Sequence, residues 1–131
     1  MTITTQLAMF LENRPGTLAR LCTALSEARI NVFAISTSDT VDHTVIRMVV
    51  SDPQRALFLL EEHGTLVVEN EVLLIEGDNK PGSLAALAEQ LGRAKVNIEY
   101  LYAASGPKSK RGLLVLRVSD PKKALRVLSK T

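Results

Sequence analysis

The sequence predicts an α+β protein made of two copies of one βαββαβ unit. Residues 13–32 align with residues 79–98 at an offset of 66, and nine of the 20 positions are identical. Residues 49–60 align with residues 117–128 at an offset of 68, and seven of the 12 positions are identical. Apolar strand patterns and amphipathic helix patterns follow one another in the same order in both copies.

The length of the chain suits this duplication. The chain has 131 residues, of which 46% are hydrophobic and 23% are charged. We predict two domains, residues 1–70 and residues 71–131, joined without a linker. The change of offset adds two residues to the second copy, and we expect them in the loop at residues 105–111, which contains Gly, Pro and Ser.

Each copy is expected to begin with a strand, at residues 6–11 and 72–76. The turn Asn-Arg/Lys-Pro-Gly then opens a helix whose apolar residues recur at helical spacing. This stripe is Leu18, Leu21, Cys22, Leu25 and Ala28 in the first copy, and Leu84, Leu87, Ala88, Leu91 and Ala94 in the second. Because Cys22 lies on the stripe and aligns with Ala88, we expect it to be a small core residue.

A β-hairpin follows each of these helices. Its strands are expected at residues 30–37 and 44–50, and at residues 96–103 and 113–118. Each hairpin leads into Ser-Asp-Pro, in which Asp can cap a second helix and Pro can occupy its first turn.

A fourth strand is expected at residues 65–70, but the second copy has no sequence left for one. We therefore predict antiparallel sheets with helices on one face, with the second repeat lacking its last strand. The unpaired edge could be filled by a partner chain or by the neighbouring copy, and it favours a dimer.

The Asn-x-Pro-Gly turn has features of a small-molecule site. The first N–H groups of a helix lack partners within the helix and attract anions. Asn13 and Asn79 add an amide with both donor and acceptor atoms, which suits an α-amino acid. Gly16 and Gly82 would let a ligand approach the backbone. The same turn is also an ordinary strand-to-helix connection, so both interpretations stay open.

Asn31 and Asn97 recur where the second strand of each copy begins. Asn at this point can end the preceding helix, which is the interpretation that the spacing favours. Alternatively, these side chains could face a ligand held between neighbouring first helices.

Composition excludes several other functions. Residues 1–70 carry 5 Lys/Arg and 8 Asp/Glu, and residues 71–131 carry 11 and 6, without the aromatic and basic clusters typical of nucleic-acid binding. Metal and nucleotide motifs are absent from the sequence, and no apolar run is long enough for a membrane span. One cysteine and an N-terminus without signal-peptide features favour a cytoplasmic location.

Four sequence strings resemble ACT domains, which have a ferredoxin-like βαββαβ fold. They are LENRPGTLARL, ARINV, DNKPGSLAAL and AKVNIEYLYA, and together with the duplication they resemble small tandem ACT proteins of bacteria. The resemblance implies a non-catalytic regulatory protein, without a cofactor, that binds an amino acid at interfaces between ACT domains. The homodimer is expected from the missing edge strand of the second copy, not from the resemblance.

The resemblance further implies which residues bind the ligand. They are Asn13, Pro15, Gly16, Thr17, Leu18 and Asn31 in the first copy, and Asn79, Pro81, Gly82, Ser83, Leu84 and Asn97 in the second. Many family members have Asp where this chain has Asn13 and Asn79.

An amino-acid sensor is therefore the leading functional hypothesis. As an alternative, the chain could be an interaction subunit that docks on a biosynthetic enzyme, as the small regulatory subunit of acetolactate synthase does, and transmits feedback control. Acylphosphatases share the order of elements, but their Gly-rich loop followed by Phe-Arg is missing here, so catalysis is not expected.

Overall fold

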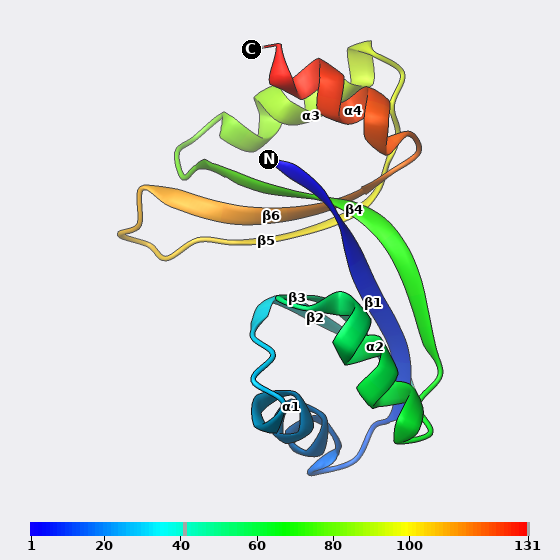
Figure 1. Ribbon diagram of the computed structural model, residues 1–131. Coiled ribbons are helices and arrows are strands. Elements are labelled where there is room, and N and C mark those ends of the chain that lie inside the picture. The colour runs from blue at the N-terminus through cyan, green and yellow to red at the C-terminus, as the bar shows by residue number, and fades with distance from the viewer. Residues whose placement is uncertain (41, 131) are drawn as a thin grey trace. The chain divides into compact units, whose positions relative to one another are not determined.

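A computed structural model describes residues 1–40 and 42–130, which form strands and helices in the predicted order (Figure 1). The elements are β1 (Thr2–Glu12), α1 (Thr17–Glu27), β2 (Val32–Asp39), β3 (His43–Val50), α2 (Pro53–Glu62), β4 (Val67–Asp78), α3 (Ser83–Arg93), β5 (Ile98–Ala104), β6 (Arg111–Val118) and α4 (Pro121–Ser129). The prediction of an α+β fold with two βαββαβ-like repeats is confirmed.

The chain divides into two compact units. The N-terminal unit is Thr5–Asn70, and the C-terminal unit consists of Glu71 onward together with Met1–Thr4. The two strands expected on either side of Asn70 are one continuous strand, β4, whose first residues belong to one unit and whose later residues belong to the other. β1 is divided in the same way.

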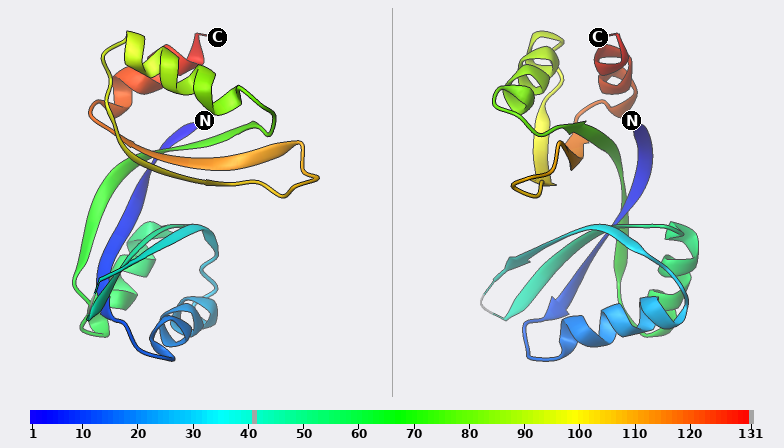
Figure 2. Two further views of the ribbon diagram at one scale, coloured as in Figure 1. Left: turned by 180° about the vertical axis from the view of Figure 1, so that it is seen from behind. Right: turned by 90° about the vertical axis from the view of Figure 1, so that its left-hand side faces the viewer.

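The N-terminal unit has the strand order β2-β3-β1-β4. β1 pairs antiparallel with β3, and β3 pairs antiparallel with β2. Both helices lie on one face of these strands (Figure 2). Leu21 and Leu25 of α1, with Leu60 of α2, pack there against Met9 and Ile46, which form the centre of the core.

The C-terminal unit has the strand order β1-β4-β6-β5. Its sheet is also antiparallel where β6 pairs with β4 and β5, and α3 and α4 cover one face (Figures 1 and 2). Leu91 of α3 and Leu128 of α4 pack against Leu73 and Leu116. The two units thus have equivalent cores.

The missing last strand of the second copy is replaced by the N-terminus of the chain. No strand follows α4 in the part of the chain that the structure describes. Instead, Met1–Thr4 joins the C-terminal unit, and Ile3 packs against its core. Two sources were expected for this pairing, a partner chain or the neighbouring copy. The structure shows that the neighbouring copy supplies it.

The Ser-Asp-Pro motif starts the second helix of each unit as predicted. Asp52 is the N-cap of α2 and accepts a hydrogen bond from the backbone N–H of Arg55 at 3.2 Å. Asp120 caps α4 in the same way, with the N–H of Lys123 at 3.1 Å. The caps satisfy helix N–H groups that have no partner within the helix.

The expected core position of Cys22 is wrong, because its side chain is exposed. The buried side of α1 contains Leu21 and Leu25, with Ala24 and Ala28 half-buried, whereas Leu18 is exposed. Both sets of positions have the i, i+3, i+4 spacing, so an 11-residue helix does not determine its buried side from spacing alone.

None of the described helices is long and apolar enough to cross a membrane.

Candidate functional site

Each Asn-x-Pro-Gly turn ends in a glycine with left-handed backbone geometry. Gly16 has φ +87° and Gly82 has φ +88°, and each is the residue from which a helix starts. A side chain is disfavoured in this conformation, so glycine is needed for the turn itself. A Cβ at Gly82 would meet no atom within 4 Å, and the backbone there is open to an approaching molecule.

The helices that follow these turns begin with free backbone donors. Neither Gly16 nor Gly82 provides a capping side chain, and the first turns of α1 and α3 contain no acidic residue. Within the described residues, the backbone N–H groups of Leu84 and Ala85 have no hydrogen-bond acceptor. These two donors, together with the helix dipole, form a local environment that favours a carboxylate.

Asn79 holds a loop in place. Its Nδ2 donates to the carbonyl oxygens of Gly106 at 3.0 Å and Ser109 at 2.7 Å, which fixes the long β5–β6 loop. Its Oδ1 accepts no hydrogen bond from the described residues, so this atom is available to a ligand. At the equivalent turn, the backbone N–H of Asn13 donates to the carbonyl of Asp42 at 3.1 Å, and the Asn13 side chain makes no hydrogen bond with the described residues.

Asn31 and Asn97 do not end the first helices. Arg29 and Lys95 have positive φ instead, and the N–H of Ile30 returns to the carbonyl of Leu25, as in a Schellman motif. The helix-ending interpretation favoured for the two asparagines is therefore wrong.

The backbones of Asn31 and Asn97 bond to the serine of Ser-Asp-Pro. Asn31 N–H donates to Ser51 Oγ at 2.9 Å, and Ser51 N–H donates to the Asn31 carbonyl at 2.9 Å. Asn97 and Ser119 repeat this pair. Both asparagine side chains remain exposed.

A cavity of about 200 Å³ lies beside the turn of the C-terminal unit. Its apolar part is formed by Ile75, Leu84, Leu87, Ala103 and Leu114, and its remaining lining residues are Gly77, Asp78, Asn79, Lys80, Ser83 and Ser105. The cavity brings together three of the six predicted residues of this copy, Asn79, Ser83 and Leu84. Pro81, Gly82 and Asn97 do not line it.

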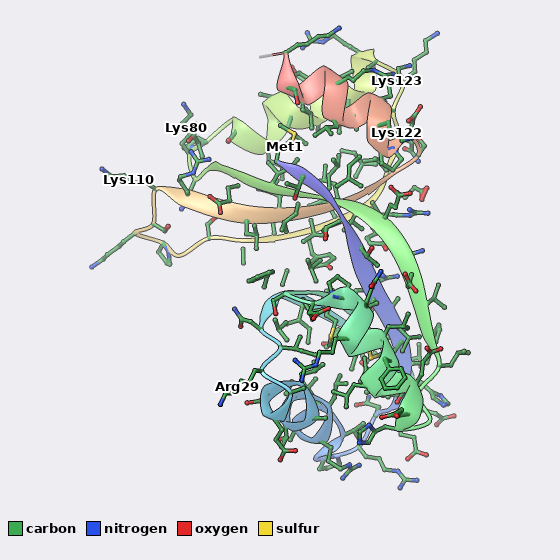
Figure 3. All side chains as sticks on the ribbon, in the orientation of Figure 1. Met1, Arg29, Lys80, Lys110, Lys122 and Lys123 are labelled. Atoms are coloured by element: carbon green, nitrogen blue, oxygen red, sulfur yellow. The ribbon has the colours of Figure 1, made fainter. Side chains whose placement is uncertain are left out.

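The rim of this cavity carries both signs of charge. Asp78 Oδ1 lies 3.2 Å from Arg111 Nη1, and Asp78 Oδ2 lies 3.9 Å from Lys80 Nζ. All three side chains are more than half exposed, so they retain their water and can exchange partners at little cost. Figure 3 shows Lys80 and Lys110 at the same end of this unit, where the turn meets the β5–β6 loop.

The N-terminal unit has a cavity that shares part of this lining, since Leu11, Thr17 and Leu21 correspond to Gly77, Ser83 and Leu87, but that extends toward α2. It has about 230 Å³ and is lined by Leu11, Thr17, Arg20, Leu21, Ala24, Leu60, His63 and Thr65. Thr17 is the one predicted residue that lines it, and Thr17 Oγ1 is buried without a hydrogen-bond partner. Asn13, Pro15, Gly16, Leu18 and Asn31 lie outside it, so the two copies are not equivalent.

Several lining residues of the C-terminal cavity were missed by sequence reasoning. Gly77, Asp78 and Lys80 flank the turn, and Leu87 and Leu114 form its apolar floor. The repeat alignment contained a usable signal, because Gly77 aligns with Leu11 while most other apolar positions keep a large side chain.

The chain belongs to the ACT domain pair family, whose family model matches residues 1–131. It is similar in structure to protein BT0572 from Bacteroides thetaiotaomicron, with 31% identity and a TM-score of 0.90 over 98% of this chain and 88% of that one. No curated protein matches the sequence.

The fold is also that of the regulatory subunits of aspartate kinase from two Thermus species. The ligand-free subunit from Thermus thermophilus has 20% identity and a TM-score of 0.72, with 99% of this chain and 97% of that chain covered. The subunit from Thermus flavus has 20% identity and a TM-score of 0.67, with coverage of 98% and 94%.

Proposed function

We propose that this protein is a non-catalytic regulator that binds an amino acid beside the turn between β4 and α3. One observation carries the proposal: the cavity of the C-terminal unit places free helix N–H groups, carboxylate and amide oxygens and an apolar floor together. An α-amino acid needs donors for its carboxylate, acceptors for its ammonium and a place for its side chain.

The described residues suggest a division of roles. The ligand carboxylate would accept from the N–H groups of Leu84 and Ala85 and from the Ser83 hydroxyl, close to the positive end of the α3 dipole. The ligand ammonium would donate to Asn79 Oδ1 and to Asp78, which lies across the turn. Pro81 and Gly82 would support the site by shaping the turn that presents these groups. Asn97 bonds to Ser119 after β6 and is not part of the proposed site.

The proposal includes a homodimer that covers the site at an interface between ACT domains. Leu84 at the cavity and Leu18 at the equivalent position of α1 are 47% and 43% exposed. A second chain packed on the first helices would bury them and close the site. Sedimentation equilibrium tests this part, because a monomer at all concentrations would contradict it.

A thermal-shift panel of the twenty amino acids, followed by calorimetry, tests the binding proposal. A ligand that binds the folded state raises the melting temperature, by several degrees when its concentration is about 100 times its Kd. We expect at least one amino acid to do so at millimolar concentration. The absence of a shift with all twenty would exclude free amino acids as ligands.

A second candidate function is that of a regulatory subunit for an amino-acid biosynthetic enzyme. The likeness to regulatory subunits of aspartate kinase over 97% and 94% of their length favours it, and acetolactate synthase is another enzyme type with such a subunit. Mixing the chain with a candidate enzyme and measuring feedback inhibition tests this function. An enzyme whose inhibition is the same with and without the chain would not be its partner.

A further inference from the structure

The two copies differ at one position beside the turn. Gly77 in the C-terminal unit occupies the place of Leu11 in the N-terminal unit, 66 residues earlier. The strand registers agree, because Gly77 pairs with Gly112 and Leu11 pairs with Thr44, 68 residues before Gly112. Both residues of this pair therefore lack a side chain in the C-terminal unit. The side chain of Ser105 lies against Gly112 and occupies part of the space there.

The backbone does not require a glycine at position 77. Positive φ is found at Gly16, Gly64 and Gly82 among the described glycines, and Gly77 is not one of them. A Cβ built on Gly77 would lie 3.4 Å from Leu114 Cδ1, which is an ordinary contact. The consequence of glycine here is space, and this space is part of the 200 Å³ cavity.

In the N-terminal unit, the equivalent position carries the side chain of Leu11. Its side chain packs against the core and lines the other cavity, on the side of α2. The remaining apolar positions are large in both copies, since Ile75, Leu87 and Leu114 correspond to Met9, Leu21 and Ile46. The pair Gly77 and Gly112, in place of Leu11 and Thr44, is thus the main difference in side-chain volume beside the two turns.

We propose that the C-terminal unit alone binds the ligand and that Gly77 selects an amino acid with an aliphatic side chain. This inference rests on the function proposed above. The polar groups lie at the rim, where the main-chain groups of the ligand would bind, and the floor consists of Ile75, Leu87 and Leu114. A charged side chain on this floor would lose its hydration without gaining a partner. An aliphatic one would gain the free energy of apolar burial.

Calorimetry on the full chain, with leucine, isoleucine, valine, alanine, aspartate and lysine as ligands, tests the inference. We expect about one binding site per chain and an affinity for the branched aliphatic amino acids at least roughly tenfold above that for aspartate and lysine. Two equal sites per chain, or a preference for a charged amino acid, would overturn it.

Gly77→Leu copies the N-terminal unit and should reduce aliphatic binding at least roughly tenfold, a change of about 1.4 kcal/mol or more. Gly92→Leu is the matched control, because it adds the same side chain to α3 in the same unit where no atom lies within 4 Å. The control should bind as the unmodified chain does. Undiminished binding by a folded Gly77→Leu variant would overturn the inference.

Gly77→Ala keeps the test decisive if the leucine variant does not fold. Its Cβ only touches Leu114, so it should weaken leucine binding more than alanine binding. Equal changes for both amino acids would contradict a selecting role for Gly77. If the unmodified chain binds none of the twenty amino acids, the proposed function itself fails, which is a different outcome from binding that ignores position 77.

Discussion

At the scale of single residues, the glycines of the two turns have separate tasks. Gly16 and Gly82 are required by the left-handed backbone from which α1 and α3 start. Gly77 has no such conformation, and its effect is the space beside Leu114. The turn motif thus reflects folding, whereas Gly77, outside the motif, contributes to the cavity next to it.

Substituting Gly82 by alanine should lower the free energy of unfolding by about 1–2 kcal/mol, because an L-residue is strained at this φ. Gly92→Ala serves as the control, since Gly92 lies inside α3 with open space around it. This control should raise stability by roughly 0.5–1 kcal/mol. Urea unfolding followed by circular dichroism measures both, and equal effects of the two substitutions would contradict the assignment.

At the scale of elements, Asn and Ser-Asp-Pro form one hydrogen-bonded motif in each unit, which joins two strand ends and caps the second helix. Asn31 and Ser51 exchange hydrogen bonds between the start of β2 and the end of β3, and Asp52 then caps α2. Asn97, Ser119 and Asp120 repeat this arrangement before α4. The motif explains why these residues recur in both copies without reference to a ligand.

Removal of the cap with Asp120→Ala should destabilise the chain by about 1 kcal/mol, because the N–H of Lys123 loses its acceptor. Asp120→Asn retains a side-chain oxygen and should cost much less. Thermal unfolding of both variants checks this expectation. A similar loss for alanine and asparagine would show that the hydrogen bond is not the source of the effect.

Sequence patterns predicted the elements well because turns and caps are local signals. The Pro-Gly turns and the Asp caps begin helices where expected. The buried side of α1 was not predictable, since two overlapping apolar stripes have the same spacing and tertiary packing chooses between them. Likewise, the shape of each cavity depends on how the residue at position 11 or 77 packs against the neighbouring strands. The turn motif contains no information about this packing.

At the scale of the whole molecule, β1 and β4 each contribute residues to both units. The C-terminal unit therefore obtains its fourth strand position from Met1–Thr4, although these residues are more than sixty positions away from the rest of that unit. A 60-residue unit is marginally stable alone. We infer that the folded structure of the C-terminal unit depends on the first residues of the chain for its stability.

Ile3→Ala should therefore lower stability by about 1–2 kcal/mol, less than the roughly 2–5 kcal/mol for a fully buried isoleucine, because Ile3 is half-buried against the C-terminal core. Ile3→Val removes one methylene group and should cost less than about 1 kcal/mol. Hydrogen exchange of β4 amides measures the effect locally. Unchanged protection in Ile3→Ala would contradict a supporting role for these residues.

Amino-acid binding beside the β4–α3 turn can be measured residue by residue in an amide NMR titration. With the amino acid that gives the largest thermal shift, we expect the strongest shifts at Leu84 and Ala85, whose N–H groups are free, and at Gly77 in the cavity. Leu18 and Ala19 at the corresponding turn should change little. Shifts that are strongest outside the C-terminal cavity, or equal at both turns, would contradict the account.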